Sequence, residues 1–150
     1  MHIHRAVGAA IILLSLSACA RTPPATASAS ERAPELAGTH WRAERIGSAD
    51  LSALEPARWP TLEFDPDENR VSGHGGCNRY AGPYHHEGDA LGFGPLAQTK
   101  MGCDGPAGRI EQQFQAALAE VTSKRVVDDH LELLDATGQA RIVLRADTKR

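Results

Sequence analysis

The segment Thr61-Leu62-Glu63-Phe64-Asp65 shows the pattern that decides the fold, because its apolar residues alternate strictly with polar ones. Alternation with a period of two puts the apolar side chains on one face of a β-strand and the polar ones on the other. The same pattern recurs at 39–45, 90–93, 130–133 and 141–145. Strands of this half-buried kind are typical of an antiparallel sheet.

Turn-forming residues separate these segments. Asp, Asn, Pro and Gly are frequent at 65–69, 87–89, 128–129 and 135–138. Such residues favour tight turns, either through side-chain hydrogen bonds to the local backbone or through unusual φ values. We therefore expect short connections between the strands.

One segment follows a helical period instead. Apolar residues spaced for one helix face stand at Ile110, Phe114, Ala117, Leu118 and Val121. Pro106 suits a first helical turn, and Asp104 or Gly105 could cap it. One helix beside many strands predicts an α+β domain: a curved, largely antiparallel β-sheet of about seven or more strands packed with one amphipathic α-helix.

The beginning of the chain has the features of an export signal. Residues 6–16 are apolar, and this run is much shorter than the ~20 residues needed to span a bilayer. Leu16-Ser17-Ala18-Cys19 resembles a bacterial lipobox, whose cysteine is lipidated and becomes the mature N-terminus. The alternative is an ordinary secretory signal with an unrelated cysteine. Ala20 follows the cysteine, and by resemblance to Gram-negative lipoproteins the absence of Asp there favours the outer membrane. We expect the domain at its periplasmic face, with exposure at the cell surface as the alternative.

The remaining sequence divides into three parts. Residues 19–35 contain three prolines and no large apolar side chain, so we expect a disordered tether. Residues 36–146 form one domain, and 147–150 are a polar tail. The chain of 150 residues has a formal net charge of −3, which does not suggest nucleic acid binding. We expect a monomer that contacts the membrane through its lipid anchor.

Two cysteines remain once Cys19 is assigned to lipid. Cys77 and Cys103 are an even pair in an oxidising compartment, so a disulfide between them is expected. Its geometry requires Cα atoms within roughly 7 Å of each other. The alternative is two buried free thiols that pack as small hydrophobic groups.

Two further patterns could indicate a phosphate-binding loop or a metal site. The glycine-rich run at 71–84 could cradle a phosphate, but it lacks a Gly-Lys-Ser/Thr ending, so we interpret it as a sharply bending strand. The adjacent His85 and His86 would point to opposite faces of a strand, and no metal-ligand spacing is present. We expect exposed hairpin histidines rather than a metal site, and no cofactor.

Two long motifs carry a family resemblance. They are Gly-Cys-Asn-x-Tyr-x-Gly-x-Tyr at 76–84 and Phe-Gly-Pro-Leu-Ala-x-Thr-Lys-Met-x-Cys at 93–103. With Gly38, Thr39 and Trp41 at the start and a matching helix near Glu111, they resemble the META (HslJ-like) domain family over residues 36–145. Gln98 and Gly102 depart from the usual pattern. The resemblance implies a compact α+β domain, often lipid-anchored and linked to heat shock or envelope stress, with no catalytic residues to transfer.

Five polar residues lie in these motifs beside the cysteines: Asn78, Arg79, Tyr80, Thr99 and Lys100. We expect no enzymatic role for them. Asn78 and Thr99 are expected to bond backbone groups in bent loops, whereas Arg79 and Lys100 could form a basic, ligand-facing patch. The predicted function is that of a non-catalytic envelope lipoprotein that supports envelope integrity or stress tolerance by binding other components. The alternative is an inhibitor or ligand-binding module, such as a lysozyme-inhibitor-like lipoprotein.

Overall fold

The structure is a computed structural model, and it describes residues 36–147. The predicted signal peptide, Cys19 and the whole of the predicted tether lie outside these residues. The described part contains nine strands, one α-helix and two short 3-10 helices: β1 (His40–Ile46), η1 (Leu51–Ala53), η2 (Pro56–Arg58), β2 (Thr61–Phe64), β3 (Arg70–His74), β4 (Arg79–Glu87), β5 (Ala90–Phe93), β6 (Ala97–Gln98), α1 (Pro106–Ala119), β7 (Ser123–Val127), β8 (His130–Leu134) and β9 (Ala140–Ala146).

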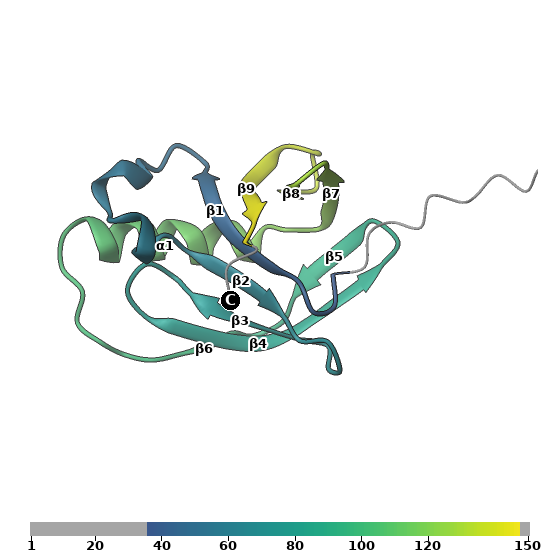
Figure 1. Ribbon diagram of the computed structural model, residues 1–150, viewed down its shortest axis with the longest axis horizontal. Helices are drawn as coiled ribbons and strands as arrows, with labels where there is room; N and C mark the ends of the chain where they lie inside the picture. Colours follow the sequence, from purple (N-terminus) through teal and green to yellow (C-terminus); the bar gives the residue numbers. More distant parts are fainter. Residues whose placement is uncertain (1–35, 148–150) are drawn as a thin grey trace, which may run out of the picture. The chain divides into compact units, whose positions relative to one another are not determined.

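Eight of the strands form a closed, antiparallel barrel (Figure 1). The order around the ring is β3-β2-β1-β9-β8-β7-β5-β4, and pairing of β3 with β4 closes it. The short strand β6 lies outside the ring and pairs with the first part of β4. The predicted α+β class with one helix is confirmed, and the predicted curved, largely antiparallel sheet goes further than expected because it closes into a barrel.

Closure depends on two features that strand periodicity does not reveal. The glycine-rich run is two strands joined by a tight turn, in which Gly75 N donates to Asn78 O at 2.8 Å, rather than one bent strand. The resulting β3–β4 pairing joins the two halves of the sheet. On the other side, β5 and β7 meet through a single paired position, Ala90 with Ser123.

One glycine in the run permits a close approach between strands. A Cβ atom on Gly73 would lie 2.1 Å from the backbone oxygen of Thr61, well inside van der Waals contact. A side chain at this position would therefore force β2 and β3 apart. Gly73 thus serves barrel packing, although the run is a hairpin and not the single bent strand that was predicted.

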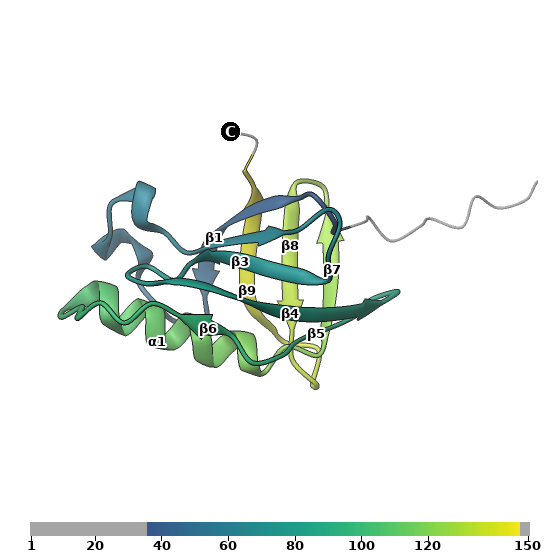
Figure 2. The same cartoon turned by 90° about the horizontal axis from the view of Figure 1, so that it is seen from below.

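The helix α1 packs against the barrel with the face that its sequence predicted (Figure 2). Its buried residues are Ala107, Ile110, Phe114, Ala117 and Leu118. Pro106 occupies the first turn and Gly105 is the N-cap, with φ +74°. This face completes a core of strand residues whose largest members include Phe64, Leu91 and Ile142. No helix among the described residues is long and apolar enough to cross a membrane.

Candidate functional site

The family-motif residues gather around one buried asparagine. Asn78 is 6% exposed, and its backbone N–H and side-chain Nδ2 donate to the two carboxylate oxygens of Glu111 on α1, at 2.7 and 2.9 Å. Its Oδ1 accepts hydrogen bonds from Thr99 Oγ1 at 2.8 Å and from Met101 N at 2.7 Å. We call Cys77, Asn78, Thr99, Met101 and Glu111 the Asn78 cluster.

The Asn78 cluster joins three separate segments: the β3–β4 turn, the loop after β6, and α1. Thr99 extends the network, because its Oγ1 also accepts from Arg79 N at 3.2 Å. Every polar atom of the Asn78 side chain is therefore occupied by the protein itself. A buried network satisfied in this way fixes the geometry of its segments and leaves no group of Asn78 to receive a ligand.

The two cysteines of the domain lie at disulfide distance, and one of them, Cys77, belongs to this cluster. The Cα atoms of Cys77 and Cys103 are 6.2 Å apart, within the range that a disulfide requires. Cys77 is 1% exposed. The pair connects the β3–β4 turn to the loop that enters α1, so it reinforces the connection made by Asn78 and Glu111.

The other predicted site residues divide by exposure. Tyr80 is buried and donates its hydroxyl to Thr61 O at 2.6 Å; burial, with the charge of Glu63, raises the pKa of Tyr80 well above its usual value. Arg79 and Lys100 are exposed. Of the five polar residues of the two motifs, these two therefore present charged groups to solvent.

The histidines do not form a metal site in the described region. His85 and His86 are both exposed, and the His86 ring stacks on Tyr84 with centroids 5.8 Å apart. The His85 ring covers Gly92 on the neighbouring strand. Among residues 36–147, no group of three or more His, Cys, Asp or Glu side chains is arranged to hold a metal ion.

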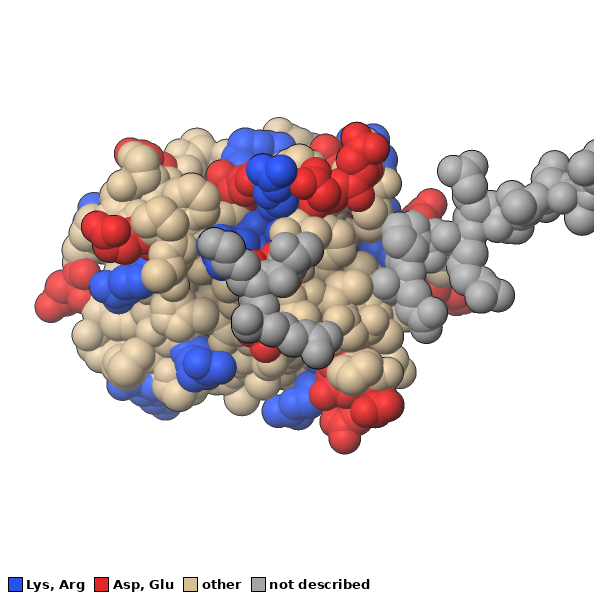
Figure 3. All heavy atoms as spheres, viewed as in Figure 1, with Lys and Arg blue, Asp and Glu red and all other residues tan. Residues whose placement is uncertain are grey.

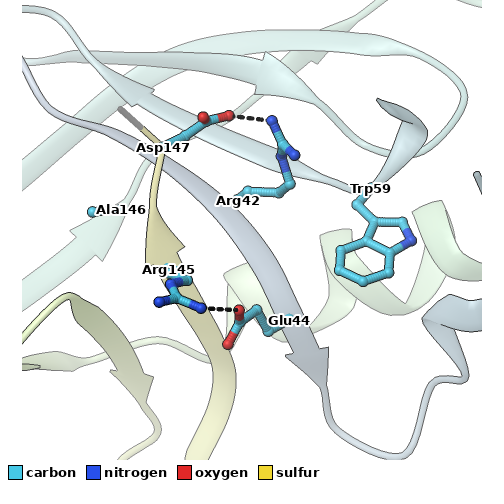
Figure 4. Close-up of a pocket in the computed structure, with 6 residues that line it drawn as sticks. All are labelled: Arg42, Glu44, Trp59, Arg145, Ala146 and Asp147. Carbon is cyan, nitrogen blue, oxygen red and sulfur yellow. Dashed lines mark hydrogen bonds and ion pairs between the residues drawn. The ribbon is translucent and has the colours of Figure 1, made fainter. Parts of the chain in front are cut away.

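A pocket of about 140 Å³ opens on the outside of the barrel, between β1, the end of β9 and the loop after η2 (Figure 4). Two arginines, two carboxylates, a tryptophan and an alanine line it: Arg42, Glu44, Trp59, Arg145, Ala146 and Asp147. We call it the charged pocket. Acidic and basic side chains also alternate over the neighbouring strands β7 to β9 (Figure 3).

The two arginines of the charged pocket stand opposite each other on paired strands. Arg42 and Arg145 are direct partners in the β1–β9 register, an arrangement that is destabilising for like charges. Carboxylates neutralise both: Arg42 Nη2 lies 2.5 Å from Asp147 Oδ2, and Arg145 Nε lies 2.9 Å from Asp129 Oδ2. Surface ion pairs of this kind contribute roughly 0–1 kcal/mol, so a binding partner can exchange with them at low cost.

A β-bulge positions the carboxylate at the centre of the charged pocket. The β1–β9 register shifts between Ala43 and Arg45, which makes Glu44 the extra residue. Glu44 Oε2 lies 3.2 Å from His130 Nε2, and its Oε1 lies 3.8 Å from Arg145 Nη1. The bulge thus directs one acidic group towards two basic side chains from β8 and β9.

Asp129 completes the charge network next to the pocket. Its Oδ1 lies 2.8 Å from His130 Nδ1. Partial desolvation raises the pKa of Asp129, but the charge and hydrogen bond of Arg145, together with His130, outweigh it and lower the pKa below the usual value. The carboxylate is therefore ionised at neutral pH and keeps Arg145 in place.

Trp59 supplies the apolar wall of the charged pocket. Its indole Nε1 donates to Leu54 O at 3.2 Å, which anchors the ring. The side chain is partly buried against the core and its remaining surface lines the pocket. A fixed aromatic face beside charged groups can contact an aliphatic, cationic or sugar surface while its neighbours supply hydrogen bonds.

The size of the charged pocket limits what it can bind. At about 140 Å³ it is smaller than the 300–1,000 Å³ typical of sites for drug-sized ligands. It therefore suits one side chain or a similar group projecting from a larger partner.

Sequence reasoning missed this pocket. The outward positions of Arg42 and Glu44 were recognised, but the pairing of β1 with the distant β9 was not. A tryptophan outside the strand pattern, followed by Pro60, was the available signal.

Comparisons with known proteins agree with this architecture. A family model described as the META domain matches residues 34–148. An NMR structure of a protein from Burkholderia xenovorans is similar, with a TM-score of 0.62 and 25% identity, over 76% of this chain and 85% of that one.

Two other solved structures share the fold at lower identity. One, the NMR structure of a protein, has a TM-score of 0.54 and 20% identity over 72% of this chain and 88% of its own. The other, a DUF4847 family protein from Bacteroides vulgatus, has a TM-score of 0.53 and 13% identity over 77% of this chain and 96% of its own. No curated protein sequence matches the chain significantly.

Proposed function

The chain belongs to the META domain family, and from this premise we propose that it is a non-catalytic binding module of the bacterial cell envelope. The charged pocket carries this proposal. It combines an anchored aromatic face with exchangeable charges of both signs, and its size suits one group of a larger partner. Partner binding would be the means by which the protein supports envelope integrity or stress tolerance.

The start of the sequence supports the envelope location. Leu16-Ser17-Ala18-Cys19 matches a lipobox, and the proline-containing segment at 19–35 would separate the domain from the bilayer. Acyl chains on Cys19 would give stable anchoring, because each buried CH₂ contributes about 0.8 kcal/mol. We place the domain at the periplasmic face of the outer membrane.

Mass spectrometry of the mature N-terminus tests the anchor. We expect a diacylglyceryl adduct on Cys19, and an unprocessed precursor when Cys19→Ser is expressed. A soluble mature protein that begins at another residue would refute the anchor without affecting the binding site.

Photo-crosslinking in the native envelope tests the binding role. A photoreactive amino acid at position 57, exposed beside Trp59, should crosslink to a defined partner, whereas one at position 97, exposed on β6, should not. Trp59→Ala in the same protein should abolish the adduct from position 57. Equal adducts from both positions, or an adduct that survives Trp59→Ala, would contradict the proposal.

The identity of the crosslinked partner separates the two forms of the function. Several envelope assembly components would support a general role in integrity. One stoichiometric hydrolase, inhibited by the purified domain, would instead identify an inhibitor.

A further inference from the structure

A second recess runs along α1, and it shares no lining residue with the charged pocket. One part has a volume of about 240 Å³ and lies between α1 and the segment 48–53; the next part, of about 180 Å³, lies between α1, the end of β1 and the start of β9. Both parts are lined by Ser48 and Gln113, so they adjoin each other along the helix. In Figure 1 the segment after β1 lies beside the first half of α1. We call this recess the helix groove.

The helix groove carries two arginines, one in each part. Arg109 is exposed on α1, and within residues 36–147 its guanidinium makes no hydrogen bond or ion pair. Arg141 pairs with Glu120 through Nη2 at 2.7 Å, but its Nε is buried and has no hydrogen-bond partner in the described structure. A buried donor without an acceptor is unfavourable. The Nε atom itself is covered by the protein, so a ligand would meet the exposed part of the Arg141 guanidinium.

The remaining polar groups of the groove also favour an acceptor-rich ligand. Ser48 and Gln113 are exposed and can donate. One carboxylate lines the groove, that of Asp50, but its Oδ1 already accepts from Ser52 N at 3.0 Å and Ser52 Oγ at 2.6 Å. Those hydrogen bonds keep Asp50 in its role as the cap of η1. Glu120 already pairs with Arg141, so the positive charge of the groove that has no ion-pair partner in the described structure is that of Arg109.

The length of the groove points to an extended chain. On α1, Arg109 and Ala117 are about 12 Å apart at 1.5 Å per residue, and Ala117 lines the same part of the groove as Arg141. An extended peptide rises about 3.3 Å per residue and presents alternate side chains on one face, so residues four apart share a face at about 13 Å. Guanidinium groups bind carboxylates in a planar, bidentate geometry.

We propose that the helix groove binds an extended acidic peptide segment of a partner protein, with two carboxylates four residues apart contacting Arg109 and Arg141. Gln113 and Ser48 hydrogen-bond the peptide backbone between these two contacts. This site acts independently of the charged pocket, so the two can be tested separately.

Amide chemical shifts test the proposal with a defined probe. Labelled domain is titrated with the peptide acetyl-Glu-Ser-Ala-Ser-Glu-amide and, in parallel, with its uncharged analogue acetyl-Gln-Ser-Ala-Ser-Gln-amide. We expect saturable shifts at residues 47–53 and 109–117 with the acidic peptide, weaker at high salt because screening reduces charge attraction. The uncharged peptide should give no saturable shift.

Variants at two exposed arginines sharpen the result. Arg109→Ala, which removes no internal contact, should weaken binding about tenfold. Arg79→Ala removes the same charge elsewhere on the surface and should leave binding unchanged. Absence of shifts up to about 10 mM peptide, equal shifts with the uncharged peptide, or shifts centred on Arg79 and Lys100 would each overturn the proposal.

Discussion

The Asn78 cluster and the charged pocket use the same kinds of polar side chain for opposite purposes. In the cluster, the amide of Asn78 is buried and completely hydrogen-bonded to groups of the domain. In the pocket, Arg42 and Arg145 lie at the surface in ion pairs that a partner can replace. The buried residues of the family motifs therefore hold the fold together, while the binding that we propose for the charged pocket uses residues outside the two motifs.

The largest expected effect comes from removing the centre of the cluster. Asn78→Ala deletes the donor to Glu111 and the acceptor for Met101 N, and it leaves buried groups unsatisfied. We expect a loss of about 3–4 kcal/mol in the free energy of unfolding, measured by urea denaturation. Gln98→Ala, at an exposed position on β6, is the control and should change stability by less than about 0.5 kcal/mol. An equal loss of stability in the two variants would show that the Asn78 cluster contributes no more to the fold than an exposed surface residue does.

The second-largest effect on stability is expected from the cysteine pair. It closes a loop with a sequence separation of 26, for which a disulfide stabilises by about 3.5 kcal/mol in the chain-entropy model. Under oxidising conditions, Cys77→Ser should cost about this amount, and the double variant Cys77→Ser/Cys103→Ser should cost no more. Two reactive thiols in unfolded, non-reduced protein would show that the bond does not form.

A high-pH experiment extends the comparison to Tyr80. The pKa of Tyr80 is raised in the folded state, so folding favours the neutral phenol. The resulting stabilisation is complete below pH 10, and it is lost as the pH rises from the pKa of the unfolded state towards the pKa of the folded state. Tyr80→Phe should cost about 1–2 kcal/mol at pH 7, because the hydrogen bond to Thr61 O is lost. Its stability should then decline less steeply than that of the wild type above pH 10. Parallel declines would show that Tyr80 does not titrate as a buried group.

The smallest effects are expected at the exposed basic residues of the motifs. Arg79→Ala and Lys100→Ala should each alter the melting behaviour by an amount equivalent to less than about 0.5 kcal/mol. A large loss would show that these side chains are structural, and would remove them as a basic binding patch.

Much of the fold follows from local pattern. The strands at 61–64, 90–93 and 130–134 and the helix face around Phe114 agree with the apolar periodicity, because each buries one face. Strand β7 was missed because Lys124 occupies an inward position: it is 3% exposed and pairs with the buried Leu133. A charged residue at a core position hides the alternation on which strand prediction depends.

Closure and the binding surfaces depend on contacts between distant segments. The β3–β4 hairpin was hidden by glycines, which are uninformative in a hydrophobic pattern. Arg42 and Arg145 are far apart in sequence, and only the β1–β9 register brings them together. The role of Glu111 as the partner of Asn78 likewise required the helix to be placed against the turn.

The double variant Arg42→Ala/Trp59→Ala, compared with Asn78→Ala in the same two assays, tests the central claim most directly. The assays are urea unfolding of the purified domain and crosslinking from position 57 in the envelope. We predict that the pocket variant keeps its stability to within about 1–2 kcal/mol and loses the crosslinked partner, whereas Asn78→Ala loses about twice as much stability. A pocket variant that unfolds as readily as Asn78→Ala, or that still captures the partner, would contradict the assignment of binding to the charged pocket.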